Sequence, residues 1–210
     1  MKMKILRSAV AWAFVAMVIL TATVIQPADS YYWDTLFPFE RVMDELALKR
    51  GQVVADIGCQ EGFLTFDLAH RVGPNSIVYA VDIDPAVLAV VTTESERMQL
   101  RQIRVIHSDP KDPMLPAGEL DVAIIANAYH EMRFPAEMLS ATRRALRQRG
   151  QLAIIERDAE DGHPRDNYYE LHKVPKPVVV REARKAGFTY IREVRPVRQG
   201  DFYFLIFKNL

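Results

Sequence analysis

The feature that most constrains the fold is one stretch in which an apolar run leads into a glycine turn and then into a helical pattern. Residues 53–57 read Val-Val-Ala-Asp-Ile, which indicates a buried parallel strand. Gly58 and Gly62 follow, and apolar side chains recur at helical spacing from Phe63 onward. A strand that turns sharply into a helix leaves backbone N–H groups free at the helix start, so we expect a ligand there.

A carboxylate distinguishes this stretch from a phosphate-binding loop. Asp56 precedes the first glycine by two residues, where it would repel a pyrophosphate but suit a ligand with an ammonium group or hydroxyls. Asp56-x-Gly58-x-x-x-Gly62 resembles motif I of the class I S-adenosylmethionine-dependent methyltransferases, whose usual pattern is Asp/Glu-x-Gly-x-Gly-x-Gly. Gln60 stands where the middle glycine is expected, which predicts a narrower methionine end of the site.

Strands and helices alternate along the rest of the chain. Further strands are predicted at residues 76–84, 103–109, 120–127 and 151–157. Helices are predicted at residues 39–48, 63–71, 85–100, 135–149 and 176–186, and residues 158–174 are predicted to be a loop. The last two strands, 188–194 and 202–208, have a short link that permits only antiparallel pairing.

This alternation predicts an α/β fold with a doubly wound, mostly parallel seven-stranded sheet closed by an antiparallel C-terminal hairpin. The closing hairpin again resembles the Rossmann-like methyltransferase fold, and the resemblance covers about residues 35–210. We therefore predict one methyltransferase-like domain over residues 31–210.

Candidate cofactor residues follow the apolar runs, because ligands of doubly wound sheets bind beyond the carboxyl ends of the strands. Asp82 can accept two hydrogen bonds from ribose hydroxyls, and Ile83 beside it is expected to pack on the adenine. The resemblance implies that Asp109 contacts the adenine amino group, although Asp109-Pro110 equally fits a simple turn. The predicted set for S-adenosylmethionine is Asp56, Gly58, Gly62, Asp82, Ile83, Asp109 and Asn127.

Candidate catalytic residues follow the fourth predicted strand. His130 can act as a base near neutral pH. Tyr129 and Glu131 are alternative proton acceptors or substrate-positioning groups, whereas packing of Tyr129 and solvent exposure of Glu131 are the competing interpretations. The sulfonium is already an activated methyl donor, so alignment of the reacting atoms matters more than a strong base.

The composition narrows the partners. The formal net charge is zero, so no basic field favours nucleic acid, and we predict a small-molecule acceptor. Cys59 is the single cysteine, which leaves no second thiol for a disulfide or for thiolate catalysis outside motif I. The 158–174 segment could fold over the substrate, but His163 and His172 lack a third partner at metal-ligand spacing, so no metal is expected. The sequence does not indicate an oligomeric state.

Two other functions compete with methyl transfer. A nicotinamide-dependent oxidoreductase could use a similar sheet, but Gly58-x-x-x-Gly62 differs from the dinucleotide pattern Gly-x-Gly-x-x-Gly, and Asp56 would have no role. A non-catalytic exported or anchored module that retains the fold is the other alternative, motivated by Gln60 and by the N-terminal segment.

The N-terminus predicts a signal peptide or membrane anchor over residues 1–30. Residues 9–25 carry no charged side chain, and a small-x-small pattern before Tyr31 fits a cleavage site. Lys2, Lys4 and Arg7 precede the apolar segment, which holds the N-terminus in the cytoplasm by the positive-inside rule. We therefore expect the folded domain on the non-cytoplasmic side, attached through residues 9–25 if they are not cleaved. A cofactor made in the cytosol argues for the opposite side, because a sulfonium does not cross a bilayer unaided.

Overall fold

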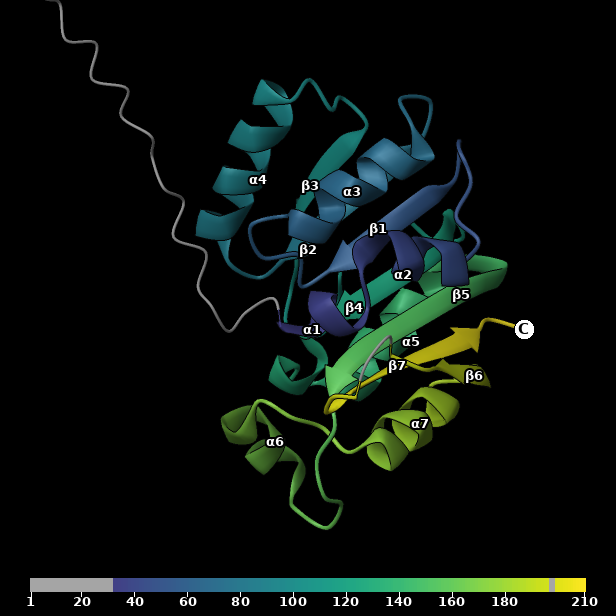
Figure 1. The fold of residues 1–210 in the computed structure, drawn as a ribbon. Helices are drawn as coiled ribbons and strands as arrows, with labels where there is room; N and C mark the ends of the chain where they lie inside the picture. The colour runs from purple at the N-terminus through teal and green to yellow at the C-terminus, as the bar shows by residue number, and fades with distance from the viewer. Residues whose placement is uncertain (1–31, 197–198) are drawn as a thin grey trace, which may run out of the picture.

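Five parallel strands run side by side from one edge of the sheet (Figure 1). The apolar runs of the four that are not at the edge are largely buried on both faces. The computed structural model describes residues 32–196 and 199–210. Within them the sheet has the order β3-β2-β1-β4-β5-β7-β6. The parallel strands are β1 (Val53–Ile57), β2 (Ile77–Asp82), β3 (Ile103–His107), β4 (Leu120–Ala126) and β5 (Leu146–Arg157).

The predicted hairpin closes the sheet. β7 (Phe202–Lys208) pairs antiparallel with β5, and β6 (Thr189–Val194) pairs antiparallel with β7 at the edge. The doubly wound, mostly parallel seven-stranded sheet predicted from the sequence is therefore confirmed.

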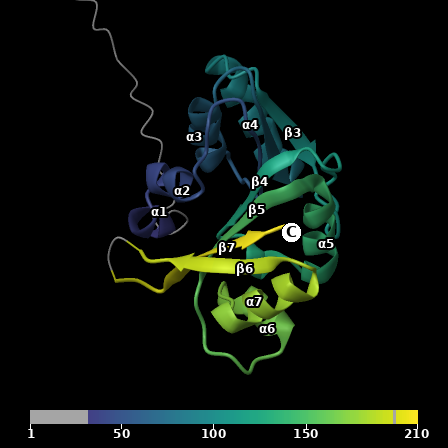
Figure 2. The same ribbon diagram turned by 90° about the vertical axis from the view of Figure 1, so that its right-hand side faces the viewer.

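Helices cover both faces of the sheet (Figure 2). On one side lie α1 (Tyr32–Leu36), α2 (Phe39–Glu45), α3 (Phe63–Val72) and α4 (Pro85–Arg97). On the other side lie α5 (Pro135–Ala145) and α7 (Lys176–Lys185).

Consecutive side chains of β1 point to opposite faces, which divides the core into two layers. Val54 packs in the cluster that includes Leu68 of α3. Ala55 packs in the cluster that includes Leu139 of α5 and Val179 of α7.

Two segments differ from the sequence prediction. The helix expected to reach residue 149 ends at Ala145, because Leu146 already pairs with Leu120 of β4. Asn209 reinforces this end, since its side-chain amide donates to the carbonyl of Leu146 at 2.9 Å. The loop expected at 158–174 contains α6 (Arg165–Leu171), which the polar sequence hid because Tyr168 is its one buried residue.

The predicted N-terminal segment 1–30, with its apolar part 9–25, lies outside the described residues. Over the parts that the structure does describe, no helix combines the length and the apolar character needed to cross a bilayer.

Candidate functional site

A cavity of about 350 Å³ lies where β1, β2 and β4 end. Figure 1 shows the arrowheads of β1 and β5 pointing toward the side of the molecule that carries α6. One part of the cavity wall comes from the turns after β1, β2 and β3, and the other from the segment after β4 and from α6. Among the lining residues are Gly58, Gln60, Asp82, Ile83, Asp109 and Glu131.

The backbone of the turn after β1 lies against the segment after β4, which explains why a glycine is needed at position 58. Its φ of 79° is left-handed, and a Cβ added there would lie 2.5 Å from the Cβ of Ala128. Two backbone amides of this turn are already hydrogen-bonded within the chain. Gly58 and Cys59 donate to the carbonyl of Val81 at 2.8 and 3.0 Å, so the turn is fastened to β2.

Gln60 continues this attachment. Its backbone N–H donates to Oδ2 of Asp82 at 2.9 Å, and the residue lines the cavity. Its φ of 49° is left-handed, which is unfavourable for a glutamine but open to a glycine. Gln60 therefore has the backbone conformation of a glycine at a position that lines the cavity.

The carboxylate of Asp82 is held in place by backbone donors. Oδ2 accepts from Gln60, and Oδ1 accepts from the N–H of Asp84 at 3.0 Å. Each carboxylate oxygen has a further lone pair available. Ile83 lies beside it with 54% of its surface exposed, unusual for an isoleucine and suited to an apolar ring.

The turn after β3 completes this end of the cavity. Asp109 lines the cavity, but its Oδ1 also accepts from the N–H of Lys111 at 2.8 Å. Both interpretations of Asp109-Pro110 are thus compatible with its position. Asp84 does not line the cavity and caps α4, accepting from the N–H of Ala86 at 2.8 Å.

Three of the predicted cofactor residues do not line the cavity. Asp56 is buried beneath the turn, where its Oδ2 accepts from the hydroxyl of Thr65 at 2.7 Å. Burial raises the pKa of Asp56 to about 7, against the opposing effect of the Thr65 hydrogen bond. Gly62 is the N-cap of α3, and Asn127 has a left-handed φ of 51° with its N–H bonded to the carbonyl of Ile155.

The three candidate catalytic residues form a 3-10 turn, η1 (Tyr129–Glu131), but only Glu131 lines the cavity. Tyr129 is fully buried, and its hydroxyl donates to Glu182 at 2.6 Å. Burial first, and then the Glu182 carboxylate, raise its phenol pKa well above the ordinary value. The burial of Tyr129 is what its packing interpretation predicts. The Glu131 side chain is 54% exposed, as its solvent-exposed interpretation predicts.

His130 is held by a buried carboxylate at the end of β5. Glu156 is fully buried, and its Oε2 accepts from both the backbone N–H and Nδ1 of His130, at 3.0 and 2.9 Å. Burial alone would lower the pKa of His130, but the hydrogen bonds and charges of Glu131 and Glu156 outweigh it and raise the pKa to about 9. An imidazole protonated at neutral pH cannot accept a proton, which argues against the expected role of His130 as a base.

Sequence reasoning missed Glu156, although the signal was present. A carboxylate follows the apolar run of β5 directly, which is the pattern that identified Asp82. It also missed the apolar cavity wall formed by Phe134 and Met138, whereas Tyr169 belongs to the 158–174 segment that was expected to fold over the substrate. Phe134 and Met138 lie at the start of α5 and Tyr169 lies in α6, so only folding brings them to one wall.

Folding also brings His172 close to His130 and Glu131, which the sequence spacing did not reveal. His172 ends α6 with a left-handed φ of 48°, and its Nδ1 lies 3.4 Å from Nε2 of His130. The ligand atoms of His130, Glu131 and His172 all lie within 4.8 Å of one another. His172 therefore has two partners at the spacing of metal ligands, and both come from outside the 158–174 segment.

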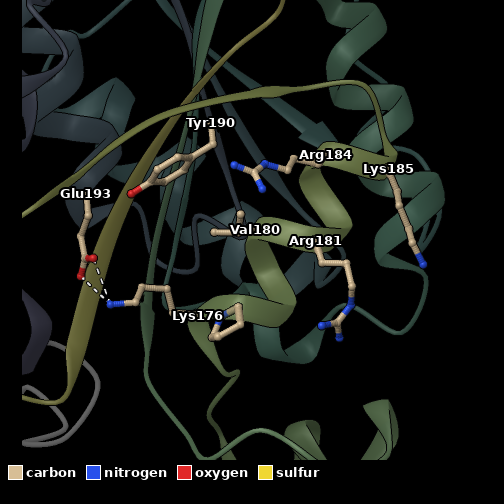
Figure 3. Close-up of a pocket in the computed structure, with 8 residues that line it drawn as sticks. Lys176, Val180, Arg181, Arg184, Lys185, Tyr190 and Glu193 are labelled. Atoms are coloured by element: carbon tan, nitrogen blue, oxygen red, sulfur yellow. Dashed lines mark hydrogen bonds and ion pairs between the residues drawn. The ribbon is translucent and has the colours of Figure 1, made fainter.

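A second groove of about 680 Å³ lies away from the strand ends (Figure 3). Its walls are α7 and β6, and its side chains include Lys176, Arg184 and Tyr190. Lys176 is paired with Glu193 at 3.0 Å, and the Arg184 guanidinium lies over the ring of Tyr190. The groove is an open, solvated surface with no contribution from motif I.

Comparison with known proteins identifies the class to which this fold and site belong. Residues 48–191 match the family described as "Methyltransferase domain". The chain therefore belongs to the class I S-adenosylmethionine-dependent methyltransferases, as the motif I resemblance implied.

Individual relatives are more distant. The chain is 25% identical over 171 residues to a tRNA U34 carboxymethyltransferase of Mannheimia succiniciproducens, covering 76% of this chain and 52% of that protein. It is 30% identical over 116 residues to the nocamycin O-methyltransferase of Saccharothrix syringae, covering 54% of this chain and 41% of that protein. The chain thus spans about half the length or less of these curated relatives. The crystal structure of a methyltransferase from Aquifex aeolicus superposes with a TM-score of 0.74 at 24% identity, over 84% of this chain and 92% of that one, which supports the fold.

Proposed function

We propose that the cavity binds S-adenosylmethionine and that the chain transfers its methyl group to a small molecule. The observation that carries the proposal is the position of Asp82. Its carboxylate is fixed by two backbone amides at the cavity wall, beside the exposed Ile83. A fixed carboxylate next to an apolar surface suits a ribose joined to a flat base.

The opposite part of the cavity is the proposed acceptor site. Phe134, Met138 and Tyr169 provide apolar surface, and Glu131 provides a carboxylate. This mixture is typical of small-molecule sites, which are mostly apolar with a few polar groups that set orientation. The name of the nocamycin O-methyltransferase agrees with such an acceptor, whereas the tRNA carboxymethyltransferases act on a different class. The zero net charge favours the small molecule.

Catalysis is proposed to depend on alignment. The sulfonium needs a nucleophile in line with its methyl group and its sulfur, which the two parts of the cavity would hold. His130 does not line the cavity, and the carboxylates of Glu131 and Glu156 raise its pKa, so no proton transfer to it is included.

Calorimetry with the full chain tests the cofactor. We expect binding of S-adenosylmethionine and S-adenosylhomocysteine but not of NAD. Binding of NAD alone would refute the proposal in favour of the oxidoreductase. Release of S-adenosylhomocysteine in the presence of a panel of hydroxylated aromatic and enol compounds tests transfer. Cofactor binding without release in any such assay would favour the non-catalytic module.

We further propose that residues 1–30 direct the chain to a membrane, with the folded domain on the non-cytoplasmic side. The support is the basic cluster Lys2, Lys4 and Arg7 before the uncharged segment 9–25. A reporter fused after Leu210 tests the orientation. Activity of a reporter that works only in the cytosol, with the protein still bound to the membrane, would overturn it.

A further inference from the structure

The unexplained feature beside the proposed methyl-donor site is the convergence of two histidines and a glutamate from separate segments. His130 and Glu131 come from η1, and His172 ends α6. Nε2 of His130 lies 3.4 Å from Nδ1 of His172 and 3.7 Å from Oε1 of Glu131. Two ligands of a tetrahedral zinc ion, each about 2.0–2.1 Å from the metal, lie about 3.3 Å apart. The two distances from His130 are therefore close to those of a metal site, and all three ligand atoms lie within 4.8 Å of one another.

The orientation of His130 has the arrangement that metal ligands need. Its Nδ1 donates to the fully buried Glu156, so a metal ion that displaces the Nε2 proton would meet the Nε2 lone pair on the side of the cluster. A ligating histidine almost always donates its other N–H to a carboxylate or carbonyl, which orients the ring and raises its basicity. Glu156 also accepts from the backbone N–H of His130 at 3.0 Å, so both ring and main chain are fixed by one carboxylate.

Charge and access favour a cation at this place. Glu131 and Glu156 supply two carboxylates, and the nearby Arg165 is engaged elsewhere, with Glu182 and the carbonyls of Tyr129 and Met132. His130 is buried, whereas Glu131 and His172 are exposed, so an ion has a path from solvent. Glu131 also lines the acceptor part of the cavity at the strand ends, so the cluster lies at the edge of that cavity.

We propose that His130, Glu131 and His172 form a binding site for a divalent transition metal ion, zinc foremost, with Glu156 as the residue that orients His130. Two imidazoles and one carboxylate are a usual ligand set for catalytic zinc, which keeps a fourth position open. On the proposed function, a metal-binding hydroxyl or enolate of the acceptor would take that fourth position. The acceptor class would then be oxygen nucleophiles able to bind a metal.

The test is metal binding to the untagged full chain after treatment with a chelator. We expect one Zn²⁺ per chain by calorimetry, and the visible absorption of tetrahedral Co²⁺ when cobalt replaces it. His172→Ala should weaken Zn²⁺ binding at least tenfold, and Glu156→Gln should weaken it about 10- to 100-fold, as expected for a residue that orients a ligand. His163→Ala is the matched control, because it removes an exposed histidine of the same segment, and it should leave affinity unchanged.

Two results would overturn the proposal. One is the absence of stoichiometric Zn²⁺ binding by the unaltered chain, which would leave a hydrogen bond between the two rings as the whole explanation of their contact. The other is equal Zn²⁺ affinity in the unaltered chain and in His172→Ala. S-adenosylhomocysteine binding is measured on the same samples. If the unaltered chain binds Zn²⁺ but not S-adenosylhomocysteine, the proposed function is refuted and the metal site is not.

Discussion

Replacement of Asp82 by alanine is the most direct test of the proposed ribose contact. The carboxylate already accepts from Gln60 and Asp84, at 2.9 and 3.0 Å, so its position in the cavity does not depend on a ligand. Such preorganisation means that little ordering is needed when a ligand binds.

The expected effect follows from the hydrogen bonds that alanine cannot make. A hydrogen bond to a charged group contributes about 1.5–3 kcal/mol. Loss of one such bond at the lower limit weakens binding about tenfold, and loss of two weakens it more than about 100-fold. We therefore expect Asp82→Ala to raise the Kd of S-adenosylhomocysteine at least tenfold, measured by calorimetry.

Two variants separate ligand contact from damage to the turn. Asp82→Asn keeps an oxygen that can accept from the Gln60 amide but removes the charge, so it should fall between the unaltered chain and Asp82→Ala. Asp84→Ala removes a nearby carboxylate that does not line the cavity. It should lower the free energy of unfolding by about 1 kcal/mol through loss of the α4 cap, with the Kd unchanged. An unaltered Kd in Asp82→Ala would refute the ribose assignment.

Three further predictions follow from the residues around the turn and the cavity. Gln60→Gly should keep or raise both thermal stability and affinity for S-adenosylhomocysteine, because its left-handed φ of 49° suits glycine and its backbone N–H is retained; a collapse of affinity would identify the Gln60 side chain as a ligand contact. The raised pKa of Asp56 means that the folded state binds a proton more tightly than the unfolded state, so the free energy of unfolding should fall as pH rises from about 4 to 7. Asp56→Asn can still accept from Thr65 and should flatten this pH dependence, measured by urea titrations. Tyr129→Phe should lower the free energy of unfolding by about 1 kcal/mol through loss of the Glu182 hydrogen bond, without changing S-adenosylhomocysteine release with any acceptor found by the screen; a large fall in that release would restore Tyr129 as a catalytic candidate.

The sequence alone determined the sheet and predicted that Asp82 and Ile83 lie at the edge where the cavity is found. An apolar run such as residues 53–57 indicates a buried strand by itself, and the local order of strand, glycine turn and helix is encoded within about a dozen residues. Asp82 and Ile83 were predictable for the same reason, because the end of a strand in a doubly wound sheet is always at the ligand edge. The cap at Asp84 is equally local.

The tertiary structure decided which polar side chains meet. Leu146 pairs with Leu120 and ends α5 early, a contact between segments that no local pattern contains. His130 is 42 residues from His172 and 26 from Glu156, and their contacts exist because the end of β5 and α6 both reach η1. Side-chain environment depends on such long-range packing, and so do the pKa of His130 and the burial of Tyr129. The surroundings of the three candidate catalytic residues are therefore what local sequence could not predict.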